Sequence, residues 1–197
     1  MSDVDGIAAN VRRVRTRIVD ATRRAGRPDH AVTLVGATKT VDADRVSVAL
    51  RAGLVDIGEN RAQELLAKAP VLAAAPDSPH WHFLGALQRN KVRALSQWVT
   101  CWESVDRLAL GRTIAKHAPG ARVLIEVNLA GEAQKAGCAP LEAPDLADEL
   151  RALGLHVAGL MTVPPHGDDP RPWFAQLRAL GERLALAELS MGMTDDF

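Results

Sequence analysis

The chain opens with apolar residues spaced three and four positions apart among charged ones. These apolar positions are Val4, Ile7, Ala8, Val11, Val14 and Ile18. Such spacing predicts an amphipathic helix over about residues 2–25, with its arginines on a solvated face. Ser2 is followed three residues later by Asp5, which resembles a capping box and places the start of the helix almost at the first residue.

Beyond residue 30, short β-branched apolar runs alternate with longer stretches of helical spacing. The apolar runs predict strands over 32–37, 54–57, 81–84, 99–102, 123–127, 155–161 and, less clearly, 187–190. Helices are predicted between them, one capped by Asp42 and ending at Gly53, one capped by Asp106, and others over 60–68, 90–97, 144–153 and 172–186. Because the strands are almost continuously apolar, we expect them to be parallel and covered by helices on the outside.

Two α/β architectures fit this alternation. An open doubly wound sheet binds its ligand at a glycine-rich turn after an early strand, and none of the predicted strands ends in GxGxxG. A (β/α)8 barrel has eight strands, and seven precede the last residue, Phe197. The pattern alone leaves both architectures open, with the barrel one strand–helix unit short of closure.

Composition and charge narrow the range of functions. The 197 residues include 24 basic and 24 acidic side chains, so the net charge is near zero, which argues against a general binder of nucleic-acid backbones. No apolar stretch has the length of a membrane span or the character of a signal peptide, and the two cysteines lack metal-ligand spacing. We therefore expect a cytoplasmic protein that binds neither nucleic acid nor membranes.

In both architectures the functional site forms at the C-terminal ends of the strands. The polar residues there are Thr38 and Lys39, Glu59 and Asn60, Gly85 and Gln88, Glu103 and Ser104, Asn128, Thr162, and the segment 190–194. Lys39 is the most informative, because apolar surroundings favour a neutral amine, which attacks aldehydes to form a Schiff base. The alternative is a strand-end lysine that reaches solvent.

Two further groups of residues invite a chemical interpretation. His80 and His82 lie two apart on a predicted strand and so share a face, as a metal-binding pair does. No further ligands assemble around them, so we expect no metal and a packed, hydrogen-bonded role for His82. Ser190 and Thr194 flank a glycine at a strand end, where hydroxyls and backbone amides favour an anion. The alternative there is a helix N-cap by Thr194.

Several of these residues lie within stretches that are specific when taken together. The stretches are VGATKT (35–40), IGEN (57–60) with QE (63–64), WHFLGALQRNK (81–91), EVN (126–128), KAG (135–137), GLMTVP (159–164) and LSMGMTDD (189–196). In order and spacing they resemble the pyridoxal phosphate homeostasis proteins, which are single-domain barrels related to the N-terminal domain of alanine racemase. The resemblance covers nearly the whole chain.

The resemblance implies an α/β fold, namely a single (β/α)8 TIM-type barrel domain over 1–197, and a bound pyridoxal 5′-phosphate (PLP). Lys39 matches the lysine that holds PLP as a Schiff base, and Asn60 matches a residue beside it. Ser190 and Thr194 match the segment that helps to hold the phosphate. Family members usually continue with a helix and a final strand, so this sequence is expected to lack the last helix–strand unit.

The expected function follows from the acid–base groups available. Racemisation needs such groups on both faces of the substrate carbanion, and the alanine racemase resemblance implies a lysine and a tyrosine in these roles. This sequence contains no tyrosine. We therefore expect a monomeric binding protein that masks the PLP aldehyde on Lys39 and supplies or buffers PLP for PLP-dependent apo-enzymes, without racemase activity. The alternative is a Schiff-base barrel enzyme, either aldolase-like or with residual PLP-dependent amino-acid chemistry.

Overall fold

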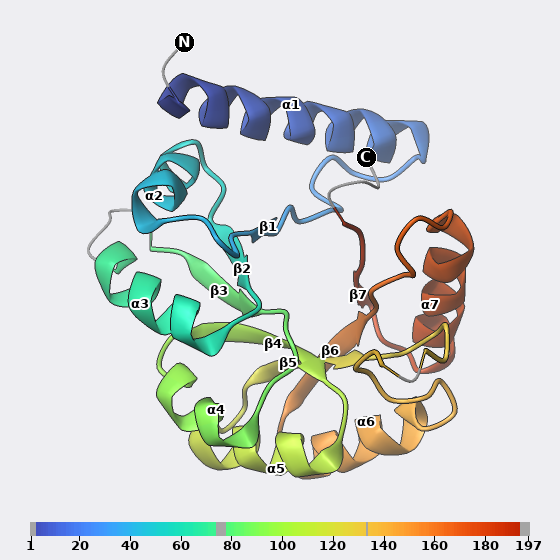
Figure 1. The fold of residues 1–197 in the computed structure, drawn as a ribbon. Coiled ribbons are helices and arrows are strands. Elements are labelled where there is room, and N and C mark those ends of the chain that lie inside the picture. Colours follow the sequence, from blue (N-terminus) through green and yellow to red (C-terminus); the bar gives the residue numbers. More distant parts are fainter. Residues whose placement is uncertain (1–2, 74–77, 133, 194–197) are drawn as a thin grey trace. The chain divides into compact units, whose positions relative to one another are not determined.

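Strands and helices alternate along the chain, as predicted (Figure 1). The structure is a computed structural model that describes residues 3–73, 78–132 and 134–193. It divides into two compact units, residues 1–82 and 83–197. That both units form one domain over 1–197 stays a prediction.

The first unit begins with a long helix and continues with three strands. Its elements are α1 (Asp3–Arg24), β1 (Gly36–Ala37), α2 (Ala43–Arg51), β2 (Asp56–Glu59), α3 (Ala62–Leu72) and β3 (His80–Phe83), whose last residue opens the second unit. The strand order is β1-β2-β3, and β1 and β2 are parallel, with Ala37 opposite Gly58. Helix α1 packs against α2, and Arg15 donates a hydrogen bond of 2.5 Å to the carbonyl oxygen of Gly53. The predicted N-terminal helix is therefore present.

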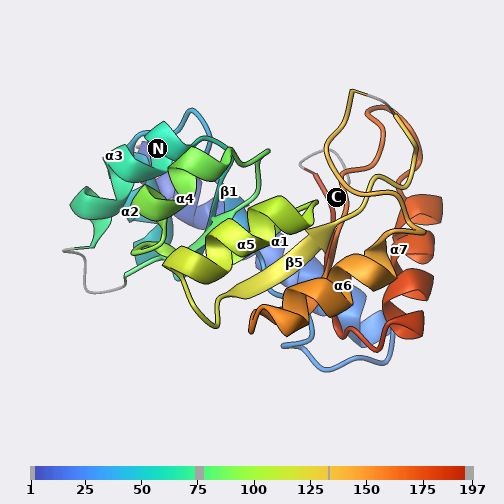
Figure 2. The same ribbon diagram turned by 90° about the horizontal axis from the view of Figure 1, so that it is seen from below.

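The second unit is a parallel sheet with its helices on one face. Its elements are α4 (Arg89–Leu95), β4 (Val99–Val105), α5 (Leu108–His117), β5 (Arg122–Glu126), α6 (Ala143–Ala152), β6 (His156–Met161), α7 (Arg171–Arg183) and β7 (Glu188–Ser190). The strand order is β4-β5-β6-β7, and each neighbouring pair is parallel. Figure 2 shows α5 and α6 lying over β5, on the side where Figure 1 places them. The C-terminal ends of these strands consequently meet at one edge of the sheet.

Local sequence signals explain where helices begin and end. The Asp42 carboxylate accepts a hydrogen bond of 2.8 Å from the Arg45 amide, which caps α2 as predicted. Gly53 follows α2 with a φ of 86°, a conformation that glycine adopts without a Cβ clash. The cap predicted at Asp106 is wrong. Arg107 holds the N-cap position of α5, and the Asp106 carboxylate pairs with the Arg107 guanidinium instead.

The first predicted strand is much shorter than expected. Of residues 32–37, only Gly36 and Ala37 belong to β1, and Val32 is 43% exposed. Strand β1 is the first in the sheet order, and its neighbour β2 begins to pair with it at Ile57, opposite Gly36. Residues 32–35 therefore lie before the part of the chain that pairs with β2, although their β-branched composition is typical of a strand.

The core of the second unit is built from strand residues packed under amphipathic helices. The rings of Phe83 and Trp102 lie 6.5 Å apart between centroids, and both side chains are almost completely buried. Helices α5 and α6 bury Ile114 and Leu150, respectively, while their charged residues face outward. In the described part of the chain, no helix combines the length and the apolar character needed to cross a membrane.

Gly159 on β6 lies against the backbone of β7, so one added methyl group should destabilise the second unit. A Cβ at Gly159 would lie 1.9 Å from the carbonyl oxygen of Glu188, and backbone atoms cannot move aside as a flexible side chain does. We expect Gly159→Ala to lower the free energy of unfolding by about 1–3 kcal/mol in urea denaturation. Gly6→Ala on α1 is the control, because its Cβ meets nothing within 4 Å and alanine favours helices. Equal stability of the two variants would contradict this packing.

Candidate functional site

Lys39 lies in a tight turn directly after β1. The Val41 amide donates a hydrogen bond of 3.0 Å to the carbonyl oxygen of Thr38, so Lys39 takes the second position of a four-residue turn. Thr40 takes the third position with a φ of 66°, the positive φ that a type II turn requires there. The Lys39 side chain is exposed at the corner of this turn.

The Lys39 amine forms no hydrogen bond or ion pair with the other residues that the structure describes. Lys135, in contrast, lies 2.6 Å from Glu132 and donates a hydrogen bond of 3.0 Å to the carbonyl oxygen of Pro164. The predicted apolar surroundings of Lys39 are wrong, because the turn corner turns its side chain toward solvent. The amine is therefore accessible to a small molecule.

Asn60 follows β2, which is the neighbour of the strand that precedes Lys39. It follows β2 directly and is half-buried. Because Ala37 pairs with Gly58 in parallel register, Lys39 and Asn60 each come two residues after a paired position. The two predicted site residues of the first unit are thus at the same edge of the sheet.

A buried polar network adjoins the turn, and sequence reasoning missed it. Lys68 on α3 is only 8% exposed, and its Nζ donates a hydrogen bond of 2.7 Å to the carbonyl oxygen of Thr38. The same Nζ lies 2.5 Å from Oε1 of Glu59, which is completely buried. A signal was present: Lys68 lies three residues after Leu65 and four before Leu72, on the apolar side of the helix.

The other two predicted site residues are Ser190, in the second unit, and Thr194. Ser190 ends β7, is half-buried, and accepts a hydrogen bond of 3.1 Å at its carbonyl oxygen from the Thr162 amide. Gly192 follows with a φ of 106°, so the chain departs from the strand there. Thr194 lies outside the described residues. The role predicted for Ser190 and Thr194 in holding a phosphate stays a prediction.

Two more of the polar residues expected at strand ends hold loops in place. The Asn128 side chain donates a hydrogen bond of 2.8 Å to the carbonyl oxygen of Glu132 and accepts one of 3.3 Å from the Glu132 amide. The Thr162 hydroxyl donates a hydrogen bond of 2.9 Å to the carbonyl oxygen of Val127. These bonds indicate structural roles for Asn128 and Thr162.

Glu126, the last residue of β5, is a buried carboxyl group that sequence reasoning did not select. It is 8% exposed, and its Oε2 has no hydrogen-bond partner within the residues described. Burial raises the pKa of Glu126 to about 7, and the negative charge of Asp106 acts in the same direction. A glutamate inside the apolar run 123–127 was the available signal. This carboxyl group therefore changes protonation near neutral pH.

The histidine pair shares a face, as its spacing predicts. His80 Nδ1 lies 3.2 Å and His82 Nε2 lies 3.4 Å from the same Oδ1 of Asp56, the first residue of β2. His80 is exposed, whereas the His82 side chain is only 7% exposed. The packed, hydrogen-bonded role predicted for His82 is confirmed.

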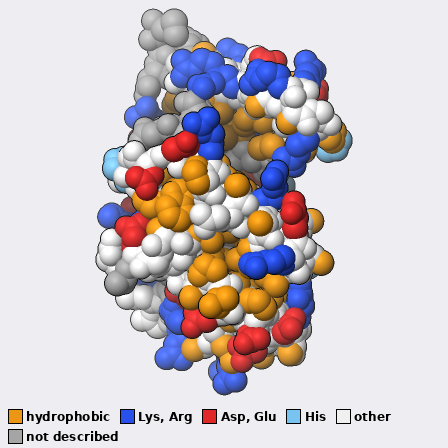
Figure 3. All heavy atoms as spheres, turned by 90° about the vertical axis from the view of Figure 1, so that its right-hand side faces the viewer, with side chains coloured by type: hydrophobic (Ala, Val, Ile, Leu, Met, Phe, Trp, Pro, Cys, Tyr) orange, Lys and Arg blue, Asp and Glu red, His pale blue; other side chains and the backbone are white. Residues whose placement is uncertain are grey.

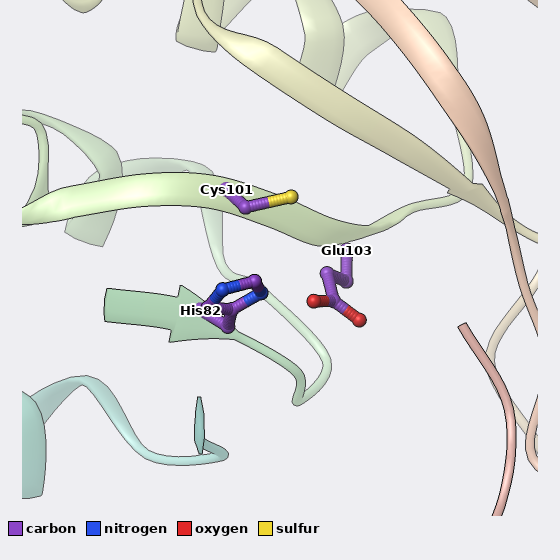
Figure 4. Close-up of side chains that lie close together, drawn as sticks. All are labelled: His82, Cys101 and Glu103. Carbon is purple, nitrogen blue, oxygen red and sulfur yellow. The ribbon is translucent and has the colours of Figure 1, made fainter. Parts of the chain in front are cut away.

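Both cysteines are buried thiols. Cys101 projects from β4 on the same side as Glu103, with a carboxylate oxygen of Glu103 within 4.8 Å of its Sγ; Figure 4 shows this pair and also draws His82 on β3. Burial raises the pKa of the Cys138 thiol to about 12, and the charge of Glu142 contributes. Cys138 therefore remains protonated and unreactive at neutral pH.

A surface groove of about 640 Å³ lies between α7 and the loop that follows β5. Its lining includes Leu129, Pro140, Gln176 and Arg183, and it contains none of the predicted site residues. Figure 3 shows the face of the molecule where α7 lies, with hydrophobic side chains gathered among charged ones. We assign no chemistry to this groove.

Comparison with known proteins defines the class of this chain. Residues 2–195 match the family described as "Alanine racemase, N-terminal domain". The pyridoxal phosphate homeostasis protein of Pseudomonas aeruginosa is 40% identical over 200 residues, which cover 96% of this chain and 86% of that protein. With this identity over nearly its full length, the chain belongs to the pyridoxal phosphate homeostasis protein family.

Solved structures support the same assignment. PipY of Synechococcus elongatus PCC7942, with PLP bound, is 32% identical with a TM-score of 0.76, covering 89% of this chain and 88% of that chain. Alanine racemase from Corynebacterium glutamicum is 17% identical with a TM-score of 0.66, covering 93% of this chain and 52% of that chain. The second likeness shows the fold alone, and it confirms the α/β barrel class that the resemblance implied.

Glu126 should make stability fall as the pH rises toward neutrality. Its pKa is raised from 4.5 to about 7 in the folded protein, so the folded state keeps a proton that the unfolded state loses between these values. The stabilisation is complete below the lower pKa and is lost as the pH rises through the higher one. Glu126→Gln is neutral throughout this range. We expect its free energy of unfolding, measured in urea, to rise by roughly 1–3 kcal/mol relative to that of wild type between about pH 5 and about pH 8.

The control for this comparison is Glu149→Gln, because Glu149 is exposed on α6. Its stability relative to wild type should not depend on pH in the same range. A difference between wild type and Glu126→Gln that is constant with pH would contradict the assignment.

Proposed function

We propose that this protein binds PLP as a Schiff base on Lys39 and buffers or supplies it within the cell. The accessible Lys39 amine at the end of β1 is the observation that carries this proposal. Membership of the pyridoxal phosphate homeostasis protein family supports it, as does the likeness to PipY with PLP bound. The strand-end position of the lysine, read from the sequence alone, leads to the same residue.

The residues present fit this cofactor. When bound, PLP supplies an aldehyde that condenses with a neutral lysine amine, so that one C=N bond forms and one water leaves. Lys39 offers an exposed amine from a turn with a defined backbone. Asn60 offers an amide at the same edge of the first sheet. We assign the phosphate to Ser190 and Thr194, because hydroxyls near a glycine with positive φ favour an anion.

We further propose that binding is the function and that racemisation is not. Racemisation requires a second acid–base group opposite the lysine. The sequence has no tyrosine for this role, and in the described residues no titratable side chain bonds to the Lys39 amine. A Schiff-base enzyme of the aldolase type is the second candidate, because the same amine serves both. Sustained turnover of an amino acid or an aldol substrate that depends on Lys39 would favour it over the carrier.

The proposal extends to partners and setting. We infer that PLP-dependent apo-enzymes receive the cofactor and that the protein acts as a monomer in the cytoplasm, with residues 1–197 in one domain. The balanced charge of 24 basic and 24 acidic residues supports the absence of a nucleic-acid partner. Size-exclusion chromatography with and without PLP measures the oligomeric state directly.

Lys39→Ala should abolish the covalent complex without unfolding the protein. We expect wild type to develop a visible absorption band with added PLP and the variant to lack it, with retention of PLP weakened about tenfold or more. Because Lys39 is exposed, the melting temperature of the ligand-free variant should match wild type. Lys116→Ala, an exposed lysine on α5, is the control and should keep the band. The proposal fails if Lys39→Ala retains both the band and wild-type affinity.

A further inference from the structure

Both peptide groups that flank Lys39 are held by side chains of one helix, α3. Lys68 Nζ donates a hydrogen bond of 2.7 Å to the carbonyl oxygen of Thr38, which belongs to the peptide before Lys39. Glu64 Oε2 accepts one of 2.8 Å from the amide of Thr40, which belongs to the peptide after it. The two side chains lie one helical turn apart, with Nζ and Oε2 separated by 3.6 Å. We call Glu64 and Lys68 the α3 clamp.

The Lys68 end of the clamp is fixed because it is buried. Its side chain is 9% exposed, and Nζ lies 2.5 Å from Oε1 of Glu59, whose side chain is not exposed at all. The same Oε1 accepts a hydrogen bond of 2.8 Å from the Thr38 hydroxyl. A buried ammonium that left these acceptors would be an unsatisfied charge. Burial and the ion pair with Glu59 therefore hold the Lys68 ammonium beside the Thr38 carbonyl.

The Glu64 end holds a strained residue. Thr40 has a φ of 66°, which is unfavourable for a β-branched side chain and persists only where the surroundings impose it. The bond from its amide to Glu64 supplies such a restraint. This bond lowers the pKa of Glu64, and the charges of Lys68 and Arg61 lower it further. The acceptor is therefore ionised at neutral pH.

We propose that Glu64 and Lys68 are positioning residues for Lys39. The α3 clamp holds the turn over 38–41 in one conformation and so fixes the root of the lysine side chain that meets PLP. The clamp forms no bond to the amine itself. This inference rests on the proposed function of Lys39. A pre-set backbone spares the ordering that binding would otherwise require, so PLP affinity depends on residues that form no bond to the Lys39 amine.

Glu64→Ala tests the clamp with little risk to the fold, because it removes an acceptor from a half-buried position. We expect the Kd for PLP, from titration of the visible band, to rise about 5- to 50-fold. The melting temperature of the ligand-free variant should stay close to that of wild type. Glu149→Ala, an exposed glutamate on α6, is the control and should leave the Kd unchanged.

A second substitution that restores PLP affinity distinguishes a positioning role of Glu64 from a general effect on the fold. Glycine adopts a positive φ without help, so Thr40→Gly should form the same turn in the absence of Glu64. We expect the double variant Glu64→Ala/Thr40→Gly to recover most of the affinity that Glu64→Ala loses. A double variant as weak as Glu64→Ala would overturn the role of Glu64 in holding this turn.

The role of Lys68 is tested with a double variant, because Lys68→Met alone leaves the Glu59 charge buried and unpaired. Lys68→Met/Glu59→Gln removes both charges together and retains an acceptor for the Thr38 hydroxyl. We expect it to fold cooperatively in thermal melts and to bind PLP with a Kd raised about 5-fold or more. A folded double variant with wild-type affinity would overturn the positioning role of Lys68.

The outcomes distinguish this inference from the function on which it rests. If wild type forms no visible complex with PLP, or if Lys39→Ala binds as wild type does, the proposed function fails. If Lys39→Ala loses the complex while Glu64→Ala and Lys68→Met/Glu59→Gln keep wild-type affinity, the function stands and the clamp is refuted.

Discussion

The Lys68 ammonium has almost no access to water and must keep its hydrogen-bond acceptors. These acceptors come from two other elements of the first unit. Lys68 comes from α3, Glu59 ends β2, and Thr38 follows β1. One oxygen of Glu59 accepts bonds from both Lys68 and Thr38, and displacing Lys68 or Glu59 leaves the buried charge of the other without this partner. The turn that carries Lys39 is therefore anchored at its base, while the amine at its tip remains accessible.

Parallel register explains why chemically useful groups gather at the strand ends. In the first unit it brings Lys39 and Asn60 to the same edge. In the second unit, Glu126 pairs with Met161, which pairs with Ser190, so β5, β6 and β7 end level with one another. Asn128 and Thr162 at that edge bind neighbouring loop residues, and Glu126 is a buried carboxyl group with a pKa of about 7. The same topology thus supplies both structural ties and titratable chemistry.

Local patterns in the sequence predict most helices and strands, and they predict Lys39 as a site residue. The cap at Asp42 and the stop at Gly53 depend on neighbouring residues only, and both are present. Lys39 could be selected because alternating strands and helices place strand ends at one edge. The α3 clamp could not be predicted, because the pairing of Lys68 with Glu59 depends on how α3 packs against β2. The cap at Asp106 fails for a local reason, because the carboxylate pairs with the adjacent Arg107.

The most direct test of Lys39 as the anchor is borohydride reduction of the protein–PLP mixture, followed by peptide mass mapping. Reduction fixes the cofactor on whichever lysine carries it. We expect the pyridoxyl group on Lys39, whereas Lys68 is buried in its ion pair and Lys135 is paired with Glu132. Modification of another lysine with Lys39 left unmodified would contradict the assignment.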